Sequence, residues 1–195
     1  MIAVIKYNAG NIHSVVHALR REGVEPMVTD NAEIIRHADK VLFPGVGEAS
    51  TTMEYLRLHK MDTLIKSLTQ PVLGICLGMQ LMCKESEEGE ASCLGLFDIN
   101  VKKFERMSNE DKIPHMGWNQ ITNLTSPLMY GVKDNGYVYF VHSYYVPLCK
   151  ETIARTNYLV QFSAALNKDN FYATQFHPEK SGTVGSKILQ NFLNL

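Results

Sequence analysis

One cysteine stands between two glycines where an apolar run gives way to a helix-like pattern. Residues 71–75 read as a short buried strand, and residues 77–82 carry apolar side chains at the spacing of a helix packed on a sheet. Cys76 lies at the junction, and Gly74 and Gly78 supply the small neighbours that a sharp strand-to-helix turn requires. Such a turn exposes the thiol at the amino end of a helix, where the helix dipole favours the thiolate. The pattern predicts a nucleophile, although a free cysteine is also commonly a small buried hydrophobic residue.

A histidine and a carboxylate two positions apart could serve this cysteine. His177 and Glu179 follow a strand-like stretch, and side chains at i and i+2 of an extended chain project to the same side. Pro178 strengthens this interpretation, because a residue that precedes proline is disfavoured in a helix. A histidine that deprotonates a thiol needs a third group to fix its tautomer. Cys76, His177 and Glu179 therefore form a candidate triad, against the alternative that His-Pro-Glu is an ordinary turn.

The loop after the third expected strand could complete the site. Residues 43–47 read Phe-Pro-Gly-Val-Gly, and nucleophile-elbow folds take one oxyanion donor from such a loop and another from the residue after the nucleophile. The candidate donors are the backbone N–H of Leu77 and the Val46–Gly47 peptide. Glycines on both sides of Val46 would let this peptide rotate, so we expect the donor to be misaligned until another molecule presses on the loop. Taken alone, the segment would be a turn or a weak phosphate-loop motif.

Metal chemistry is not indicated by the histidines and cysteines. His13 and His17 have the i, i+4 spacing of helical metal ligands, but their stretch lacks the glutamate of H-E-x-x-H and an evident third ligand. The other cysteines form no C-x-x-C pair and no zinc-site spacing. We expect these other cysteines to be reduced thiols that serve as packing residues. We expect neither a metal nor a cofactor. These cysteines are Cys83, Cys93 and Cys149.

Length and composition indicate a single globular domain over residues 1–195. The chain has 45% hydrophobic and 20% charged residues and a formal net charge of −1. This balance gives no electrostatic footprint for nucleic acid or for an anionic membrane. The apolar start is too short for a signal peptide, and no stretch approaches the length of a membrane span. We therefore expect a cytoplasmic protein.

The first half alternates strand-like and helix-like segments, which predicts a parallel sheet covered by helices on both faces. Expected strands cover residues 2–7, 25–28, 41–43 and 71–75, and expected helices cover 12–21, 31–37, 51–68 and 77–82. The second half reads as strands joined by turns, at 100–104, 119–122, 137–141, 152–156, 160–166 and 171–176. We expect these strands to form a mixed or antiparallel extension, and the acidic stretch 85–90 to be a solvated connection.

The three motifs, in this order, resemble those of the class I, or triad-type, glutamine amidotransferases. They are residues 44–47 (Pro-Gly-Val-Gly), 74–80 (Gly-Ile-Cys-Leu-Gly-Met-Gln) and 175–180 (Gln-Phe-His-Pro-Glu-Lys). The resemblance implies an α/β fold, a flavodoxin-like three-layer sandwich with a largely parallel central sheet. It also implies a cysteine that attacks the side-chain amide of glutamine, forms a glutamyl thioester and releases ammonia, after which water releases glutamate.

Two further segments are similar to those of amidotransferases that pass ammonia to a (β/α)₈ cyclase in histidine biosynthesis. They are residues 114–119 (Pro-His-Met-Gly-Trp-Asn) and 139–144 (Tyr-Phe-Val-His-Ser-Tyr). The resemblance implies a heterodimer in which the cyclase holds a phosphorylated nucleotide and this chain binds glutamine. The implied site comprises Cys76 as the nucleophile, His177 as acid and base, Glu179 as its orienting group, Gly47, Gln80, Ser143 and Tyr144 as glutamine-binding residues, and Asn11, Trp118 and Lys180 as residues that face the partner.

Three other interpretations of the sequence stay open. The same glutaminase could supply another ammonia acceptor, such as a sugar-amination enzyme or a pyridoxal synthase, although residues 115–119 disfavour the latter. The chain could be a regulatory subunit that kept the fold without the reaction, against which the intact triad argues. A freestanding cysteine peptidase would also use a cysteine elbow, but Gln80 and the Val46 loop suggest a small enclosed amide site.

Overall fold

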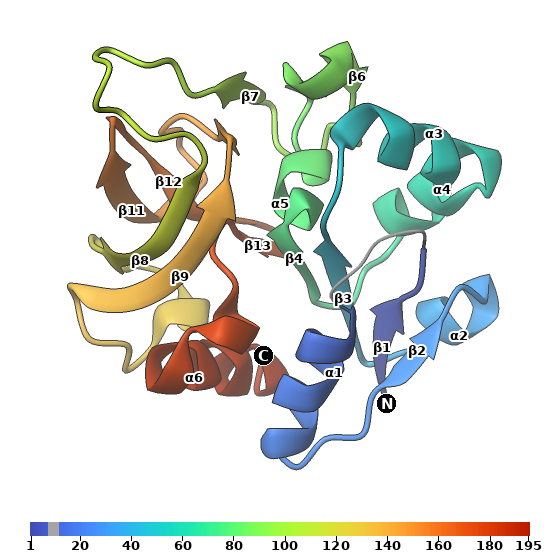
Figure 1. Ribbon diagram of the computed structural model, residues 1–195. Helices are drawn as coiled ribbons and strands as arrows, with labels where there is room; N and C mark the ends of the chain where they lie inside the picture. The colour runs from blue at the N-terminus through green and yellow to red at the C-terminus, as the bar shows by residue number, and fades with distance from the viewer. Residues whose placement is uncertain (8–11) are drawn as a thin grey trace.

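The computed structural model describes residues 1–7 and 12–195 of the chain (Figure 1). A seven-stranded sheet has the strand order β11-β12-β13-β4-β3-β1-β2. Strands β2, β1, β3, β4 and β13 pair in parallel, whereas β12 and β11 continue the sheet in antiparallel pairing. This confirms the predicted, largely parallel sheet with an antiparallel C-terminal extension. The strands are β1 (Ile2–Ile5), β2 (Met27–Thr29), β3 (Lys40–Gly45), β4 (Val72–Cys76), β11 (Thr152–Tyr158), β12 (Val160–Lys168) and β13 (Phe171–Thr174).

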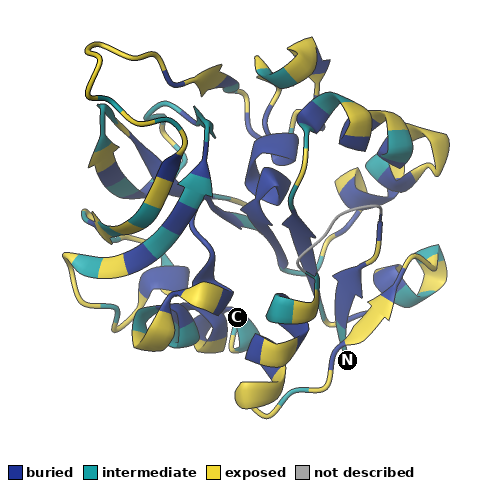
Figure 2. Cartoon of the chain, viewed as in Figure 1, coloured by how far each residue is buried: buried dark blue, intermediate teal, exposed yellow. Residues whose placement is uncertain are grey.

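Helices cover both faces of this sheet, as the predicted three-layer sandwich requires (Figure 1). One face carries α1 (Ile12–Arg21) and α6 (Gly182–Leu193), and the other carries α2 (Ala32–Arg36), α3 (Ala49–Leu58), α4 (Met61–Lys66) and α5 (Leu77–Met82). Alternation along the strands produces these two cores, since Ala3 and Ile5 of β1 pack on the side of α2 to α5, while Val4 packs on the side of α1 and α6. The central strands are accordingly buried, and the helices show buried stripes (Figure 2).

Two smaller sheets complete the fold. Strands β8 (His115–Ile121) and β9 (Gly136–His142) form an antiparallel hairpin. Strands β10 (Tyr144–Tyr145), β7 (Asn100–Lys103), β5 (Glu85–Ser86) and β6 (Ala91–Ser92) form a four-stranded sheet. Ser143 and Tyr144 therefore lie where the hairpin meets the four-stranded sheet. Short 3₁₀ helices are η1 (Glu88–Glu90), η2 (Pro127–Met129) and η3 (Pro178–Lys180). Within the described ranges, none of the helices has the length and apolar character needed to cross a membrane.

The observed elements differ from the predicted ones in several places, of which three bear on the arrangement of the sheet and the site. The expected helix over residues 51–68 is divided at Lys60, whose backbone φ of 56° is left-handed and separates α3 from α4. The interpretation of residues 85–90 as a solvated connection is wrong in part, because Glu85–Ser86 is a strand and Ser86 is buried, whereas Glu85, Glu87 and Glu90 are exposed. Helix α6 has no counterpart among the predicted elements. It packs on the sheet through Ile188, Leu189 and Phe192.

Candidate active site

The strand-to-helix turn at Cys76 has the geometry that the sequence predicts. Cys76 ends β4 and precedes α5, with a backbone φ of 55° and ψ of −107°, a conformation that is rare for a residue with a side chain. A Cβ atom on Gly78 would lie 1.9 Å from the carbonyl oxygen of Phe43, and one on Gly74 would lie 2.9 Å from Sδ of Met82. The turn at the nucleophile is therefore possible because both flanking positions lack a side chain.

The loop that follows β3 lies beside this turn. Tyr7 Oη donates a hydrogen bond of 2.6 Å to the carbonyl oxygen of Pro44, and burial raises the pKa of the Tyr7 hydroxyl. Gly47 has a backbone φ of 118°, which favours glycine at this position. Val46 and Gly47 line the same cavity as Cys76 and Leu77. The structure thus brings the three predicted oxyanion residues, Val46, Gly47 and Leu77, to the nucleophile.

His177 and Glu179 form a buried pair. Nδ1 of His177 lies 2.7 Å from Oε1 of Glu179, and the two side chains are 1% and 0% exposed. His177 is still extended, and the 3₁₀ turn that begins at Pro178 brings the carboxylate back to the ring. Burial lowers the pKa of His177, but the Cys76 thiol and the Glu179 carboxylate outweigh this effect and raise the pKa to about 10. His177 therefore contacts Glu179 directly and lines the same cavity as Cys76.

A ring of hydrogen bonds ties His177 to strand β9. The backbone N–H of His177 donates to the carbonyl oxygen of Tyr139 over 2.9 Å, and the N–H of Tyr139 donates to Oγ of Ser181 over 3.0 Å. The Ser181 hydroxyl donates to the carbonyl oxygen of His177 over 2.6 Å. Sequence reasoning missed Ser181, because nothing in the sequence distinguishes this hydroxyl from other serines near turns. Its two hydrogen bonds hold the backbone of His177 against the hairpin.

A cavity of about 340 Å³ lies between the cysteine turn and the hairpin. Most of the predicted site residues line it, while Glu179 lies against His177 and is not among the lining residues. The predicted residues in its wall are Val46, Gly47, Cys76, Leu77, Gln80, Ser143, Tyr144 and His177. The wall also contains residues that were not predicted, namely Glu88, Pro114, Val141 and His142.

Glu88 places a carboxylate in the wall of this cavity. Its Oε2 accepts a hydrogen bond of 2.9 Å from the backbone N–H of Ala49, at the start of α3. Partial burial raises the pKa of the Glu88 carboxyl group. The sequence places Glu88 in the acidic stretch that we expected to be solvated. Nothing in the sequence distinguishes Glu88 from the other three glutamates within residues 85–90, so its place in the cavity wall could not be predicted.

Gln80 connects the Ser143–Tyr144 segment to the nucleophile. Its Nε2 donates to the carbonyl oxygen of Tyr144 and to Oε1 of Gln175, each over 3.0 Å. Nε2 of Gln175 lies 3.8 Å from Sγ of Cys76. Gln175 is fully buried, and sequence reasoning assigned it no role beyond its place in the last motif. The predicted residue Gln80 is thus rigidly held at the cavity.

Two of the residues predicted to face a partner lie next to the Tyr139 ring. Trp118 on β8 is 55% exposed, and its ring contacts Tyr139 edge-on with centroids 6.0 Å apart. Nζ of Lys180 lies 6.0 Å from the centroid of the same Tyr139 ring. The third residue, Asn11, lies outside the described residues. The structure therefore gathers Trp118 and Lys180 into one surface beside the cavity.

The two histidines with metal-ligand spacing point to solvent. His13 and His17 are exposed on α1. Among residues 1–7 and 12–195, no group of three His, Cys, Asp or Glu side chains is arranged to hold a metal ion. Cys83 and Cys93 are buried and form no disulfide bond, as expected of packing residues, and Cys149 is half-buried.

Comparison with known sequences assigns the family. The model of the family "glutamine amidotransferase class-I" matches residues 3–195. The chain is 61% identical to the imidazole glycerol phosphate synthase subunit HisH of Bacteroides thetaiotaomicron, over 100% of this chain and 99% of that protein. It is 46% identical to the HisH subunit of Yersinia pseudotuberculosis, again over 100% of this chain and 99% of the relative.

Solved structures share the fold at low sequence identity. A crystal structure of a glutamine amidotransferase gives a TM-score of 0.75 at 18% identity and covers 100% of this chain and 98% of the other. The structure of PurLQS from Thermotoga maritima gives a TM-score of 0.72 at 17% identity, with 99% of this chain and 97% of the other covered. These likenesses confirm the flavodoxin-like α/β fold. With the family match and the close HisH relatives, they establish that the chain belongs to the class I glutamine amidotransferases, and within them to the HisH glutaminase subunits of imidazole glycerol phosphate synthase, in histidine biosynthesis.

Proposed function

We propose that Cys76, His177 and Glu179 hydrolyse the side-chain amide of glutamine. The observation that carries this proposal is the buried His177–Glu179 pair, of which His177 lines the same cavity as Cys76. The Cys76 thiol gives its proton to His177, and the thiolate attacks the amide carbon to form a tetrahedral intermediate. His177 then gives the proton to the amide nitrogen and the C–N bond breaks. Ammonia leaves, and a glutamyl thioester remains on Cys76.

The second half of the reaction restores the thiol. His177 takes a proton from water while the water oxygen attacks the thioester carbon. The C–S bond breaks, the proton returns to sulfur and glutamate leaves. In both halves the negative oxygen accepts hydrogen bonds from the Leu77 N–H and from the Val46–Gly47 peptide. The positive φ of Gly47 makes this peptide the adjustable donor of the two.

Glutamine is held at its amino-acid end by the wall of the cavity opposite His177. The Glu88 carboxylate offers a counter-charge to the substrate ammonium group. Gly47, Gln80, Ser143 and Tyr144 supply polar side-chain and backbone groups around the substrate. All of them line the same cavity, which supports this assignment. The hydrogen bonds of Gln80 to Tyr144 and Gln175 keep this part of the site rigid.

A (β/α)₈ cyclase subunit receives the ammonia in a heterodimer, docked on the exposed side of the β8–β9 hairpin. Met116 and Trp118 expose large apolar surfaces there, and Lys180 adds a charge beside them. Exposed apolar side chains gathered on one element are typical of an interface. The cyclase binds the phosphorylated nucleotide, in keeping with the near-neutral charge of this chain. Asn11 is also proposed to face this partner.

Docking of the partner orients the N–H of the Val46–Gly47 peptide towards the oxyanion, so that glutamine is hydrolysed when its ammonia can be used.

Glutamate release by the purified chain, alone and with a candidate cyclase and its nucleotide, tests the proposal. We expect slow release by the chain alone, a rise of roughly tenfold or more with the loaded partner, and none with Cys76→Ala. Cys93→Ala is the matched control, since Cys93 is a buried thiol that does not line the cavity. Full activity of the isolated chain would contradict the gating by the partner. Turnover by Cys76→Ala would contradict the triad.

A further inference from the structure

Two buried histidines outside the triad face each other across the β8–β9 hairpin. His115 on β8 and His142 on β9 are directly paired across the strands, and they are 3% and 6% exposed. Nδ1 of His115 lies 3.0 Å from Nε2 of His142. The reaction at Cys76 uses neither ring as acid or base. A buried polar pair of this kind requires another explanation.

The hydrogen-bond partners fix which nitrogen of each ring carries a hydrogen. Nδ1 of His142 lies 2.6 Å from the carbonyl oxygen of Tyr144, which can only accept, so this Nδ1 is the donor and Nε2 is the acceptor. Nδ1 of His115 therefore donates to His142. Nε2 of His115 accepts from Nδ2 of Asn119 over 3.3 Å, and the same amide donates to the carbonyl oxygen of Asn157 over 3.0 Å. The hydrogen bonds run in one direction, from Asn119 through both rings to Tyr144.

Packing keeps this pair neutral and in place. The His115 ring stacks on Tyr158 and on Phe140, with centroid distances of 4.0 and 4.7 Å. Burial lowers the pKa of His115 to about 4 and the pKa of His142 to about 3. Both rings are therefore neutral at neutral pH. A neutral imidazole donates with one nitrogen and accepts with the other, as this directional chain of hydrogen bonds requires.

The chain of hydrogen bonds ends in the glutamine site. The carbonyl oxygen of Tyr144 accepts from two donors, Nδ1 of His142 over 2.6 Å and Nε2 of Gln80 over 3.0 Å. Nε2 of Gln80 also donates to Gln175, whose amide contacts Sγ of Cys76. The Tyr144–Tyr145 peptide is thus fixed by one donor from the hairpin, His142, and one from helix α5, Gln80.

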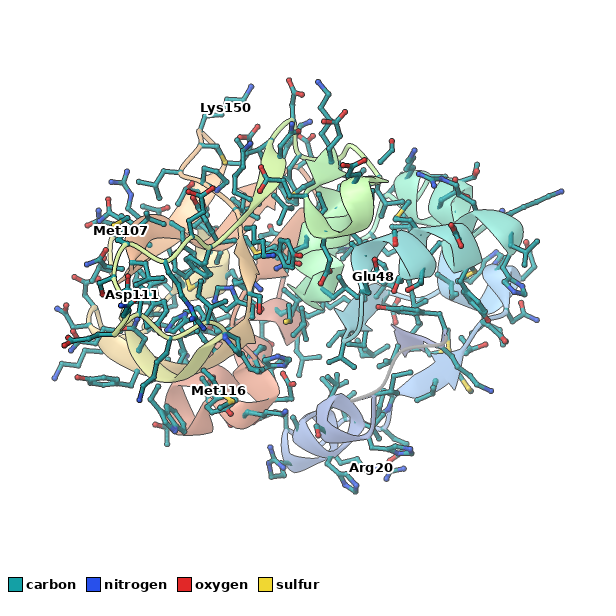
Figure 3. All side chains as sticks on the ribbon, turned by 45° about the horizontal axis from the view of Figure 1, so that its top comes forward. Arg20, Glu48, Met107, Asp111, Met116 and Lys150 are labelled. Carbon is teal, nitrogen blue, oxygen red and sulfur yellow. The ribbon has the colours of Figure 1, made fainter. Side chains whose placement is uncertain are left out.

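The opposite face of the same hairpin is exposed. Met116 and Trp118 alternate along β8 with the inward-facing His115 and Asn119, and they are 67% and 55% exposed. Met116 is labelled in Figure 3, where its side chain projects from the hairpin. Side chains on the two faces of a strand share one backbone, so any displacement of the exposed face also displaces the buried one. The two histidines lie between that exposed face and the Tyr144 carbonyl.

We infer that His115 and His142 are positioning residues, whose paired rings couple the position of β8 to the Tyr144 carbonyl and thereby set the shape of the glutamine site. This inference rests on the proposed role of Ser143 and Tyr144 in binding glutamine. Neither histidine acts on the reacting atoms. Loss of the coupling weakens the binding of glutamine more than it slows the chemical step.

Two amide substitutions separate the hydrogen bonds of His142. The side-chain nitrogen of His142→Asn takes the place of Nδ1 and can donate to Tyr144, whereas the amide of His142→Gln reaches the place of Nε2 and can pair only with His115. In the complex with the partner subunit, we expect the KM for glutamine to rise about tenfold above the wild-type value in His142→Gln. The KM of His142→Asn should be lower than that of His142→Gln by a factor of about three or more. The kcat values of the two variants should agree within about threefold. Equal KM values in the two variants, or a wild-type KM in His142→Gln, would overturn the inference.

His115→Phe provides a second test that keeps the stacked ring. The phenyl group can still pack on Tyr158 and Phe140, but His142 loses its donor. We expect the KM for glutamine to rise by about threefold to tenfold, with the far-ultraviolet circular dichroism unchanged. The control is His13→Phe, at an exposed histidine of α1, which should leave KM unchanged. This test does not depend on the folding of the His142 variants. A wild-type KM in His115→Phe would by itself overturn the inference.

Covalent labelling of Cys76 by a diazoketone analogue of glutamine separates this inference from the proposed function. The experiment uses the full chain in complex with its partner. Absence of labelling in the wild-type complex would contradict the proposed nucleophile. Equal labelling rates at subsaturating analogue in the wild type and in His142→Gln would leave the nucleophile in place and overturn the inference about the histidine pair. We expect the labelling rate of His142→Gln to be about tenfold lower, in line with its KM.

Discussion

Nδ1 of His177 lies 2.7 Å from Oε1 of Glu179, although a single residue, Pro178, separates them in the chain. The contact forms because His177 is extended, with φ of −95° and ψ of 95°, and the chain turns immediately into η3. Nδ1 donates to the carboxylate, which leaves Nε2 as the atom that would exchange a proton with Cys76 in the proposed reaction. The buried carboxylate therefore sets both the tautomer and the basicity of the imidazole.

Glu179→Gln should impair the chemical step while preserving the binding of glutamine. The substitution keeps the shape of the side chain and removes the charge, so the pKa of His177 should fall and the imidazolium formed during attack loses its counter-charge. We expect kcat of the complex to fall about 10²- to 10⁴-fold, with KM for glutamine within about threefold of the wild type. Steady-state glutamate release measures both constants. A kcat reduced by less than about tenfold would show that the carboxylate does not orient the catalytic histidine.

Gly78→Ala tests the close approach of α5 to β3. The added methyl group would lie 1.9 Å from the backbone carbonyl oxygen of Phe43, which is held in the centre of the sheet. We expect a loss of about 3 kcal/mol or more in the free energy of unfolding, measured in urea. Gly23→Ala is the control, because Gly23 has a φ of 79° but no atom within 4 Å of the added methyl group. Backbone strain alone should cost about 1–2 kcal/mol there. Equal losses at the two positions would contradict the role of close packing at the turn.

Local geometry predicts the triad residues, whereas the glutamine-binding and partner-facing residues follow only from the family resemblance. The turn at Cys76 follows from its two glycines, and the His177–Glu179 contact follows from an extended residue before proline. Glu88 and His142 depend on segments that meet only in the folded chain. His142 is paired with a residue 27 positions earlier, and Glu88 binds the backbone of Ala49, 39 positions away. Neither pairing leaves a local pattern in the sequence.

The fold shows the same division between local and long-range determinants. Helix α1 follows from apolar periodicity, and strands β1, β3 and β4 follow from short continuous apolar runs, which are typical of buried parallel strands. Strands β5, β6 and β10 contain two residues each, so alternation gives no signal. Helix α6 begins without a side-chain capping hydrogen bond from Ser181, which is used instead to hold His177. Helix α6 therefore lacks the usual N-terminal capping hydrogen bond, because the Ser181 hydroxyl that could form it is bound to the carbonyl oxygen of His177.

Acidification should destabilise the protein through His115 and His142. Burial lowers the pKa of His115 to about 4 and that of His142 to about 3, whereas the same groups in the unfolded chain titrate near 6.5. Below about pH 6.5 the unfolded state therefore binds protons that the folded state does not, and stability falls as the pH falls towards 4 and 3. We expect a slope of up to about 1.4 kcal/mol per pH unit for each histidine.

Urea unfolding between pH 7 and pH 5 measures this slope. Replacement of one buried histidine, in His115→Phe, should reduce the slope by up to about 1.4 kcal/mol per pH unit, because one of the two protected sites is lost. His17→Gln, at an exposed position of α1, is the control and should leave the slope unchanged. A slope that is the same in the wild type and in His115→Phe would contradict the assignment of the acid sensitivity to the histidine pair.

Ser181→Ala should loosen the catalytic histidine without touching the cavity. The substitution leaves the backbone N–H of Tyr139 without its acceptor and removes the 2.6 Å hydrogen bond to the carbonyl oxygen of His177. We expect a loss of about 1–3 kcal/mol in the free energy of unfolding and a lower kcat of the complex, with KM for glutamine less affected. Thr156→Val is the matched control, since its buried Oγ1 makes no hydrogen bond to any described residue, and its removal should be neutral or stabilising. If both substitutions cost the same stability and leave kcat unchanged, the Ser181 hydroxyl has no positioning role.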